Sequence, residues 1–182
     1  MTIALLVITA VAGLAMAAVY SVTLEPIAAS QKAKINNAIR MVIPEFETIH
    51  DTVMMPEDGK DSIRIHHLLT GTQNSGVAIQ TYTDEGFSGR VTLMVGFKPD
   101  GSINNIEVLD HKETPGLGNK MALPAFKDQF QGVNLGELPG EKLKVKKDGG
   151  TVDAITAATI SSRAFCDAVN RAHEINKKGE KE

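Results

Sequence analysis

The 182-residue chain contains a single cysteine, Cys166, and has neither a Cys-x-x-Cys nor a His-Glu-x-x-His sequence. A lone cysteine forms no internal disulfide, so it leaves the redox state of the compartment open, and we expect Cys166 to be a small core residue. The adjacent His66 and His67 would point to opposite faces of a strand. The chain therefore lacks the ligand spacings of a metal site, and we predict none.

An excess of positive charge is missing as well. Lysine and arginine number 19 against 22 aspartates and glutamates, the net charge is −3, and aromatic residues make up 4% of the chain. Nucleic-acid-binding domains typically carry a basic face or stripe, so this composition predicts no nucleic-acid partner. The sequence also places no histidine or acid to activate the serines of Ser161-Ser162-Arg163, and we predict no catalytic residue.

The segment Ile3–Val22 contains no charged residue and is rich in alanine, valine, leucine and isoleucine. Twenty such residues in a helix span roughly 30 Å, the thickness of the bilayer hydrocarbon. A cleaved signal peptide is the alternative, because Ala15-Met16-Ala17 is similar to a small-residue cleavage site. Signal peptides normally begin with a basic region, whereas the first lysine or arginine here is Lys32. We therefore predict an uncleaved transmembrane anchor over residues 1–24.

The rest of the chain is long enough for a single core. Residues 25–60 are predicted to form a linking helix, which begins at Pro26 and ends near Pro44, and a loop. The domain itself is assigned to residues 61–178, with a frayed tail at 179–182. Strands are predicted at Ser62–Leu68, Gly76–Tyr82, Gly89–Phe97, Ile103–Leu109, Leu143–Lys147 and Gly150–Ile155.

Turn sequences and breakers connect these strands. Lys98-Pro99-Asp100-Gly101 predicts a β-hairpin between two of them, and Asp148-Gly149-Gly150 predicts a second turn. The segment Asn119–Phe130 is expected to be a short helix or irregular structure interrupted at Pro124. An amphipathic helix is predicted from about Ser162 to Lys178. The expected fold class is α+β: a single N-terminal transmembrane helix followed by a largely antiparallel sheet with flanking helices.

Small and hydroxyl residues gather in Asp153–Ser162, just before the last helix. A helix N-terminus presents unpaired N–H groups and the positive end of the helix dipole, which favour a phosphate. Small side chains allow a phosphate to approach the backbone closely. On these grounds alone the segment is either a phosphate site or an ordinary Ser/Thr helix cap.

The order of residues in this segment is more specific than its composition. Asp153, Thr156, Ala158 and Thr159 resemble the motif Asp-x-x-(Ser/Thr)-x-Ala-Thr of the FMN-binding domain family. In that family a flavin transferase joins the FMN phosphate to the last threonine as a phosphoester. The resemblance implies covalent FMN on Thr159, with a surrounding site made of Asp153, Thr156, Ala157, Ala158, Ser161 and Ser162.

One residue of the motif departs from the family pattern. Ala157 stands where the family usually has glycine. We expect the extra methyl group to be tolerated unless the backbone at this position requires a positive φ.

A second match to the same family lies upstream, in Glu113-Thr114-Pro115-Gly116-Leu117-Gly118. In the family this loop lies against the flavin, and the residue types suit that role. Pro115 stiffens the loop, while Gly116 and Gly118 let the backbone approach a flat ring. Thr114 and the peptide N–H groups are expected to hydrogen-bond the ring heteroatoms. The resemblance therefore adds Glu113, Thr114, Pro115, Gly116, Leu117 and Gly118 to the FMN site.

The family includes the G subunit of the Rnf complex and the C subunit of the sodium-pumping NADH:quinone reductase. The resemblance implies a membrane-anchored electron-transfer subunit of an Rnf-type complex, which couples electron flow between ferredoxin and NAD to Na⁺ or H⁺ translocation. Such a subunit is a redox component of a translocase, with no substrate turnover of its own. Its expected partners are the other membrane subunits, including flavin and iron–sulfur carriers, and a flavin transferase during maturation.

Two alternatives stay open at this point. One is the C subunit of the quinone reductase, and the other is a non-redox anchored module that binds a ligand or assists assembly. The implied location is the inner (cytoplasmic) membrane, with the domain on the extracytoplasmic side. A simple count of Lys32, Lys34 and Arg40 after the span favours the opposite side, but large domains are translocated largely regardless of so weak a bias.

Overall fold

A computed structural model of the chain describes residues 1–56 and 60–179, and it divides into two compact units, Met1–Asn37 and Ala38–Glu182. The first unit is the major part of helix α1, Thr2–Val42, which is long and apolar enough to cross a membrane. We expected a separate helix to begin at Pro26, but α1 continues through that residue. A proline removes one backbone hydrogen bond, and the long helix retains those on either side of it.

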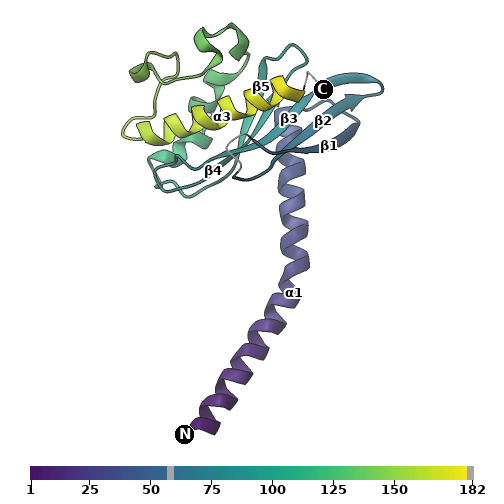
Figure 1. The fold of residues 1–182 in the computed structure, drawn as a ribbon, viewed down its shortest axis with the longest axis vertical. Coiled ribbons are helices and arrows are strands. Elements are labelled where there is room, and N and C mark those ends of the chain that lie inside the picture. The colour runs from purple at the N-terminus through teal and green to yellow at the C-terminus, as the bar shows by residue number, and fades with distance from the viewer. Residues whose placement is uncertain (57–59, 180–182) are drawn as a thin grey trace. The chain divides into compact units, whose positions relative to one another are not determined.

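The second unit contains a five-stranded sheet in which every strand pairs antiparallel with its neighbour in sequence, in the order β1-β2-β3-β4-β5 (Figure 1). This arrangement confirms the α+β fold with an antiparallel sheet. The strands are β1 Thr48–Met54, β2 Ile63–Thr70, β3 Gln73–Thr83, β4 Val91–Phe97 and β5 Ile103–His111. The predicted hairpin turn joins β4 to β5, with Gly101 at φ +81° and its N–H bonded to the Lys98 carbonyl at 2.9 Å.

Strand β1 lies in the segment that we expected to be a linking helix and loop. It is an edge strand paired only with β2, and its residues are exposed up to the last, Met54. An edge strand exposed on both faces has no hydrophobic alternation, so its sequence carries little strand signal. The end of α1 also belongs to this unit: Ile39 and Val42 are buried, and the Val42 carbonyl accepts a hydrogen bond from Asn104.

Helix α3, Thr159–Gly179, lies across one face of the sheet and packs on β3 and β4 (Figure 1). Its buried Phe165 contacts Phe126 and Phe130, whose ring centroids lie 5.1 and 4.9 Å away. These two phenylalanines come from the expected irregular segment, which forms η1 Gly118–Ala122, α2 Pro124–Lys127 and η2 Asp128–Phe130. The core therefore forms between the sheet, α3 and these short turns.

The predicted strand pair Leu143–Lys147 and Gly150–Ile155 does not form. A single parallel bridge joins Val145 to Val152 instead. The intervening segment is compact, because the Lys146 N–H bonds the Val152 carbonyl at 2.8 Å and a Cβ at Gly150 would lie 2.0 Å from the Lys144 carbonyl oxygen. Two short turns, η3 Leu135–Glu137 and η4 Pro139–Glu141, precede it, and η5 Lys146–Asp148 lies within it. Of the predicted tail, residues 180–182 lie outside the described residues.

Candidate functional site

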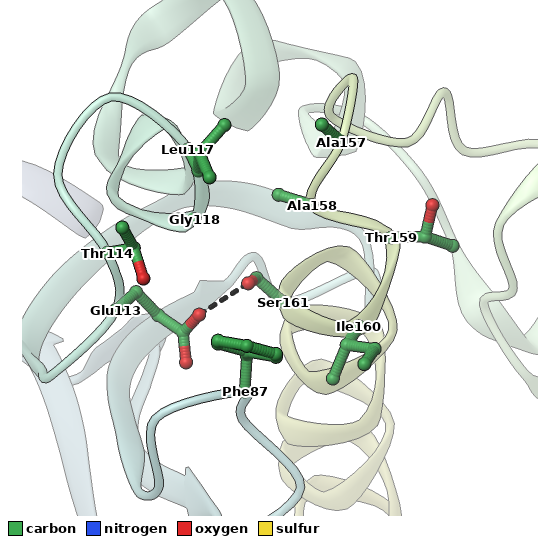
Figure 2. Close-up of a pocket in the computed structure, with 10 residues that line it drawn as sticks. All are labelled: Phe87, Glu113, Thr114, Leu117, Gly118, Ala157, Ala158, Thr159, Ile160 and Ser161. Carbon is green, nitrogen blue, oxygen red and sulfur yellow. Dashed lines mark hydrogen bonds between the residues drawn. The ribbon is translucent and has the colours of Figure 1, made fainter.

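Two segments that are distant in sequence line one cleft of about 310 Å³ in the sheet domain. The loop after β5 supplies one wall, and the residues that lead into α3 supply another (Figure 2). The structure therefore brings parts of both predicted segments together. The lining residues are Phe87, Glu113, Thr114, Leu117, Gly118, Ala157, Ala158, Thr159, Ile160 and Ser161.

Helix α3 begins at Thr159, earlier than the predicted start at Ser162, and this places Thr159 in the first turn. Its side chain is half-buried, and its hydroxyl has no hydrogen-bond partner among the described residues. The first N–H groups of any helix lack intrahelical partners. Thr159, one of the cleft-lining residues, therefore lies beside backbone donors and the positive end of the helix dipole.

The loop before Thr159 is held by Ser162. The Ser162 hydroxyl donates to the Ala158 carbonyl at 3.0 Å and accepts the Ile155 N–H at 2.9 Å. Ser162 is fully buried and does not line the cleft. Its role in the structure is to hold the turn that presents Thr159.

Ala157 adopts φ +61°, in the left-handed region. The condition under which we expected its methyl group to be tolerated is therefore not met. An L-residue in this region is destabilised by roughly 1–2 kcal/mol relative to a right-handed one, whereas glycine is not. The departure from the family's glycine thus places local strain two residues before Thr159.

We expect Ala157→Gly to raise the free energy of unfolding by about 0.5–1 kcal/mol, because relief of the strain outweighs the extra freedom of glycine in the unfolded chain. Urea denaturation of the sheet domain measures this change. Ala125→Gly is the matched control: Ala125 is exposed within α2, and the same change there should lower stability. Destabilisation by Ala157→Gly would show that the turn carries no strain.

The Glu113 carboxylate connects the walls of the cleft. The side chain is buried, with the residue 4% exposed, and its Oε2 accepts a hydrogen bond from the Ser161 hydroxyl at 2.5 Å (Figure 2). Its Oε1 accepts the Ser88 N–H at 3.0 Å. One carboxylate thus joins the loop after β5, the first turn of α3 and the loop between β3 and β4.

Gly118 lies directly against this pair. A Cβ at that position would be 2.5 Å from both Glu113 Oε2 and Ser161 Oγ, so no larger residue fits without displacing them. Gly116 differs, because open space surrounds it while its φ is +80°. Gly116 and Pro115 form the turn but do not line the cleft.

Two members of the predicted threonine motif also lie away from the cleft lining. The Asp153 carboxylate pairs with Lys146 at 2.8 Å, and its N–H donates to Gln129 Oε1 at 2.8 Å. Thr156 is exposed in the turn that precedes α3. Asp153 is therefore placed to hold the loop rather than to face the cleft.

The outer side of α3 is fixed by an ion pair. The Arg163 guanidinium donates two hydrogen bonds of 2.7 Å to the Asp148 carboxylate. This bond holds the pKa of Asp148 below its ordinary value. The turn around Asp148-Gly149-Gly150 is thereby attached to α3 one turn after Thr159.

Sequence reasoning missed two lining residues, Phe87 and Ile160. Ile160 lies inside the predicted segment Asp153–Ser162, but in the sequence it is only an apolar residue between two hydroxyl residues. Phe87 follows Gly86 in the connection between two predicted strands, and an apolar residue in a glycine-flanked loop was the available signal. Both side chains are exposed.

Other candidate clusters have structural explanations. His66 is buried and bonds Asp51 across β1 and β2 at 2.7 Å, while the adjacent His67 faces the other side of the sheet. No group of residues in the described part of the chain could hold a metal ion. Burial in the core raises the pKa of the Cys166 thiol to about 12, so it remains protonated, as expected of a core residue.

Comparison with known proteins identifies a family model and several relatives that match the chain. Residues 86–174 match the family model described as FMN-binding domain. The G subunit of the ion-translocating oxidoreductase complex of Aliivibrio fischeri (strain ES114) is 31% identical over 84% of this chain and 78% of its own. Its counterpart in Shewanella baltica (strain OS223) is 32% identical over 86% and 79%.

A solved structure is similar in fold. In a crystal structure of Shewanella oneidensis NqrC, 74% of this chain aligns with 65% of that one, with a TM-score of 0.50 and 23% sequence identity. The chain thus spans just under two thirds of NqrC. At this identity the likeness establishes a shared fold.

Proposed function

Because this chain belongs to the family of G subunits of ion-translocating oxidoreductase complexes, we propose that it is the membrane-anchored, FMN-carrying electron-transfer subunit of such a complex. The observation that carries this proposal is the cleft itself. Thr159, at the start of α3, lines it together with Glu113, Leu117 and Gly118 of the loop after β5. Parts of two motifs, each of which resembles the same family, thus line one cleft.

The cleft suits FMN in size and in chemistry. Its volume of about 310 Å³ lies within the roughly 300–1,000 Å³ of small-molecule sites. The start of α3 provides N–H donors for a phosphate, and Gly118 leaves the backbone accessible. When bound, FMN supplies one- and two-electron transfer, which connects carriers of either kind. The protein's own residues provide attachment, orientation and electrostatic tuning.

We assign the attachment to Thr159. Its oxygen forms a new bond to the phosphorus of an activated flavin nucleotide while the phosphoanhydride bond of that nucleotide breaks. The leaving nucleotide takes the electron pair, and the hydroxyl proton passes to solvent. We propose that a flavin transferase catalyses this reaction.

The membrane helix α1 fits a subunit that works within a membrane complex. Its partners are the other subunits of the ion-translocating oxidoreductase, including flavin and iron–sulfur carriers. We propose that the domain faces the extracytoplasmic side. Protease added to intact spheroplasts should then digest the domain, and full protection would place it in the cytoplasm.

In-gel flavin fluorescence tests the assignment directly. The full-length chain, produced with a flavin transferase, should give a fluorescent band under ultraviolet light after denaturing electrophoresis, because only a covalent flavin survives denaturation. Without the transferase the band should be dark. A chain that stays dark with an active transferase, while a known substrate of the enzyme is labelled in parallel, would contradict the proposal and favour a non-redox module.

A further inference from the structure

Strand β1 forms an open edge of the sheet. It pairs with β2 along its whole length, Thr48–Met54, and no segment in the described part of the chain pairs with its other side (Figure 1). In an antiparallel ladder every second residue of an edge strand directs its N–H and C=O groups away from the sheet. A row of such groups is a template on which another strand can form hydrogen bonds.

The opposite edge of the sheet is covered by the chain itself. The Ile103 carbonyl, at the start of β5, accepts the Gly132 N–H at 2.7 Å, and the Ile103 N–H donates to the Val133 carbonyl at 2.9 Å. Farther along β5, Glu107 forms an ion pair with Lys127 of α2. The fold thus covers one edge of the sheet with its own segments and leaves β1 uncovered.

Strand β1 lacks the usual protection of an open edge. Natural edge strands are protected by prolines, lysines or β-bulges, or they are very short. The seven residues of β1 include neither proline nor lysine, and their register with β2 runs without a shift from Thr48–Leu69 to Met54–Ile63. A regular strand of this kind is suited to pairing with a further strand.

The Asp51 carboxylate is held in place at the middle of β1. Its Oδ1 bonds Nδ1 of His66, a buried residue of β2, at 2.7 Å, while 68% of the Asp51 side chain stays exposed. Successive side chains of a strand alternate between faces, so Ile49 and Val53 share the face of Asp51. They are 37% and 61% exposed. The strand therefore presents a fixed carboxylate between two apolar side chains.

The sequence around β1 is acidic, and this charge selects the kind of partner. The stretch between Arg40 and Lys60 contains no lysine or arginine and five acidic residues, namely Glu45, Glu47, Asp51, Glu57 and Asp58. A second copy of β1 would bring the same negative charges to the edge, and like charges on paired strands are destabilising. A strand that carries lysine or arginine would be attracted instead.

We propose that β1 is a docking edge for a basic, extended segment of another subunit, which pairs with it as a sixth strand. This inference rests on the proposed function, because the partner is assigned to the same ion-translocating complex. Main-chain hydrogen bonds to the outward groups of β1 provide the affinity, and alternate side chains provide the specificity. A lysine or arginine of the segment lies opposite Asp51, and apolar side chains two residues to either side of it cover Ile49 and Val53.

Amide hydrogen exchange tests the docking edge without any substitution. The full-length chain is measured alone in detergent and within the purified oxidoreductase complex. We expect the outward amides of Thr48–Met54 to exchange more slowly in the complex by about ten-fold or more, since a paired amide must open before it exchanges. The amides of β3, which is paired on both sides, should keep their rate. Equal exchange of β1 in the two samples would overturn the proposal.

Substitution of Asp51 tests the charge of the partner. Asp51→Lys should lower copurification of the chain with the other subunits several-fold, whereas Asp51→Asn, which keeps an oxygen acceptor for His66, should lower it less. Asp110→Lys is the matched control, because Asp110 is an exposed aspartate on β5, and it should copurify like the parent. Equal recovery of Asp51→Lys and Asp110→Lys would show that β1 does not select a basic partner and would overturn the proposal.

The same measurements separate the other occupants and the two levels of inference. If the exchange of β1 in the isolated chain slows as the chain is concentrated, the occupant is a second copy and the proposal is wrong. A parent chain that does not copurify with the other subunits contradicts the proposed function and the docking edge together. An assembled complex in which β1 stays unprotected contradicts only the docking edge.

Discussion

Thr159→Ala should abolish covalent flavin and leave the fold intact. The Thr159 hydroxyl has no hydrogen-bond partner among the described residues, and the residue lies in the first turn of α3. Its removal should therefore change the free energy of unfolding by no more than about 0.5 kcal/mol, as is usual for surface substitutions. In-gel fluorescence and intact mass, measured after coexpression with the transferase, read out the attachment.

Thr156→Ala is the matched control for this experiment. It makes the same chemical change at an exposed threonine that does not line the cleft, and it should keep its covalent flavin. Peptide mapping of the parent should place FMN on Thr159. Mapping to Thr156, Ser161 or Ser162 would show that the assignment is wrong.

Deletion of Met1–Val22 should release a folded domain that still accepts flavin. The deleted residues lie within the separate unit Met1–Asn37 and are exposed throughout, so the sheet domain loses no core contact. After ultracentrifugation the full chain should be in the membrane pellet and the truncated chain in the supernatant, with an unchanged thermal midpoint for the domain. An aggregated truncated protein without flavin would refute an anchor joined to an independent domain.

A longer deletion provides the contrast. Removal of residues 1–43 also removes Ile39, Val42 and Ile43, which are 1%, 0% and 4% exposed in the sheet domain. Burial of each such side chain contributes about 1.5–3 kcal/mol, and the Asn104 side chain would lose its acceptor, the Val42 carbonyl. This variant should be markedly less stable than the shorter deletion, because the end of α1 is part of the core.

The sequence by itself determined the elements that a short continuous stretch of residues predicts. The uncharged run Ile3–Val22 has a length set by the bilayer, and the Lys98–Gly101 turn demands a residue with positive φ, which Gly101 supplies. The amphipathic stripe of α3 has a helical period. Both motif segments also lay in continuous stretches of sequence, and the structure places most of their residues at one cleft.

Tertiary structure decided the features that depend on contacts in space, with partners near or far in the chain. Strand β1 forms because it pairs with β2. Its residues are exposed, so its sequence shows no alternation of apolar and polar residues that would predict a strand. The expected strand pair around Gly149 became a compact turn, because the Lys144 carbonyl oxygen occupies the space beside Gly150. The left-handed conformation of Ala157 and the position of Phe87 likewise follow from hydrogen bonds made by Ser162 and Glu113. Sequence thus determined which residues were available for the site, whereas contacts in space decided their arrangement. The physical reason is that side-chain hydrogen bonds and steric exclusion act through space and produce no periodic pattern in the sequence.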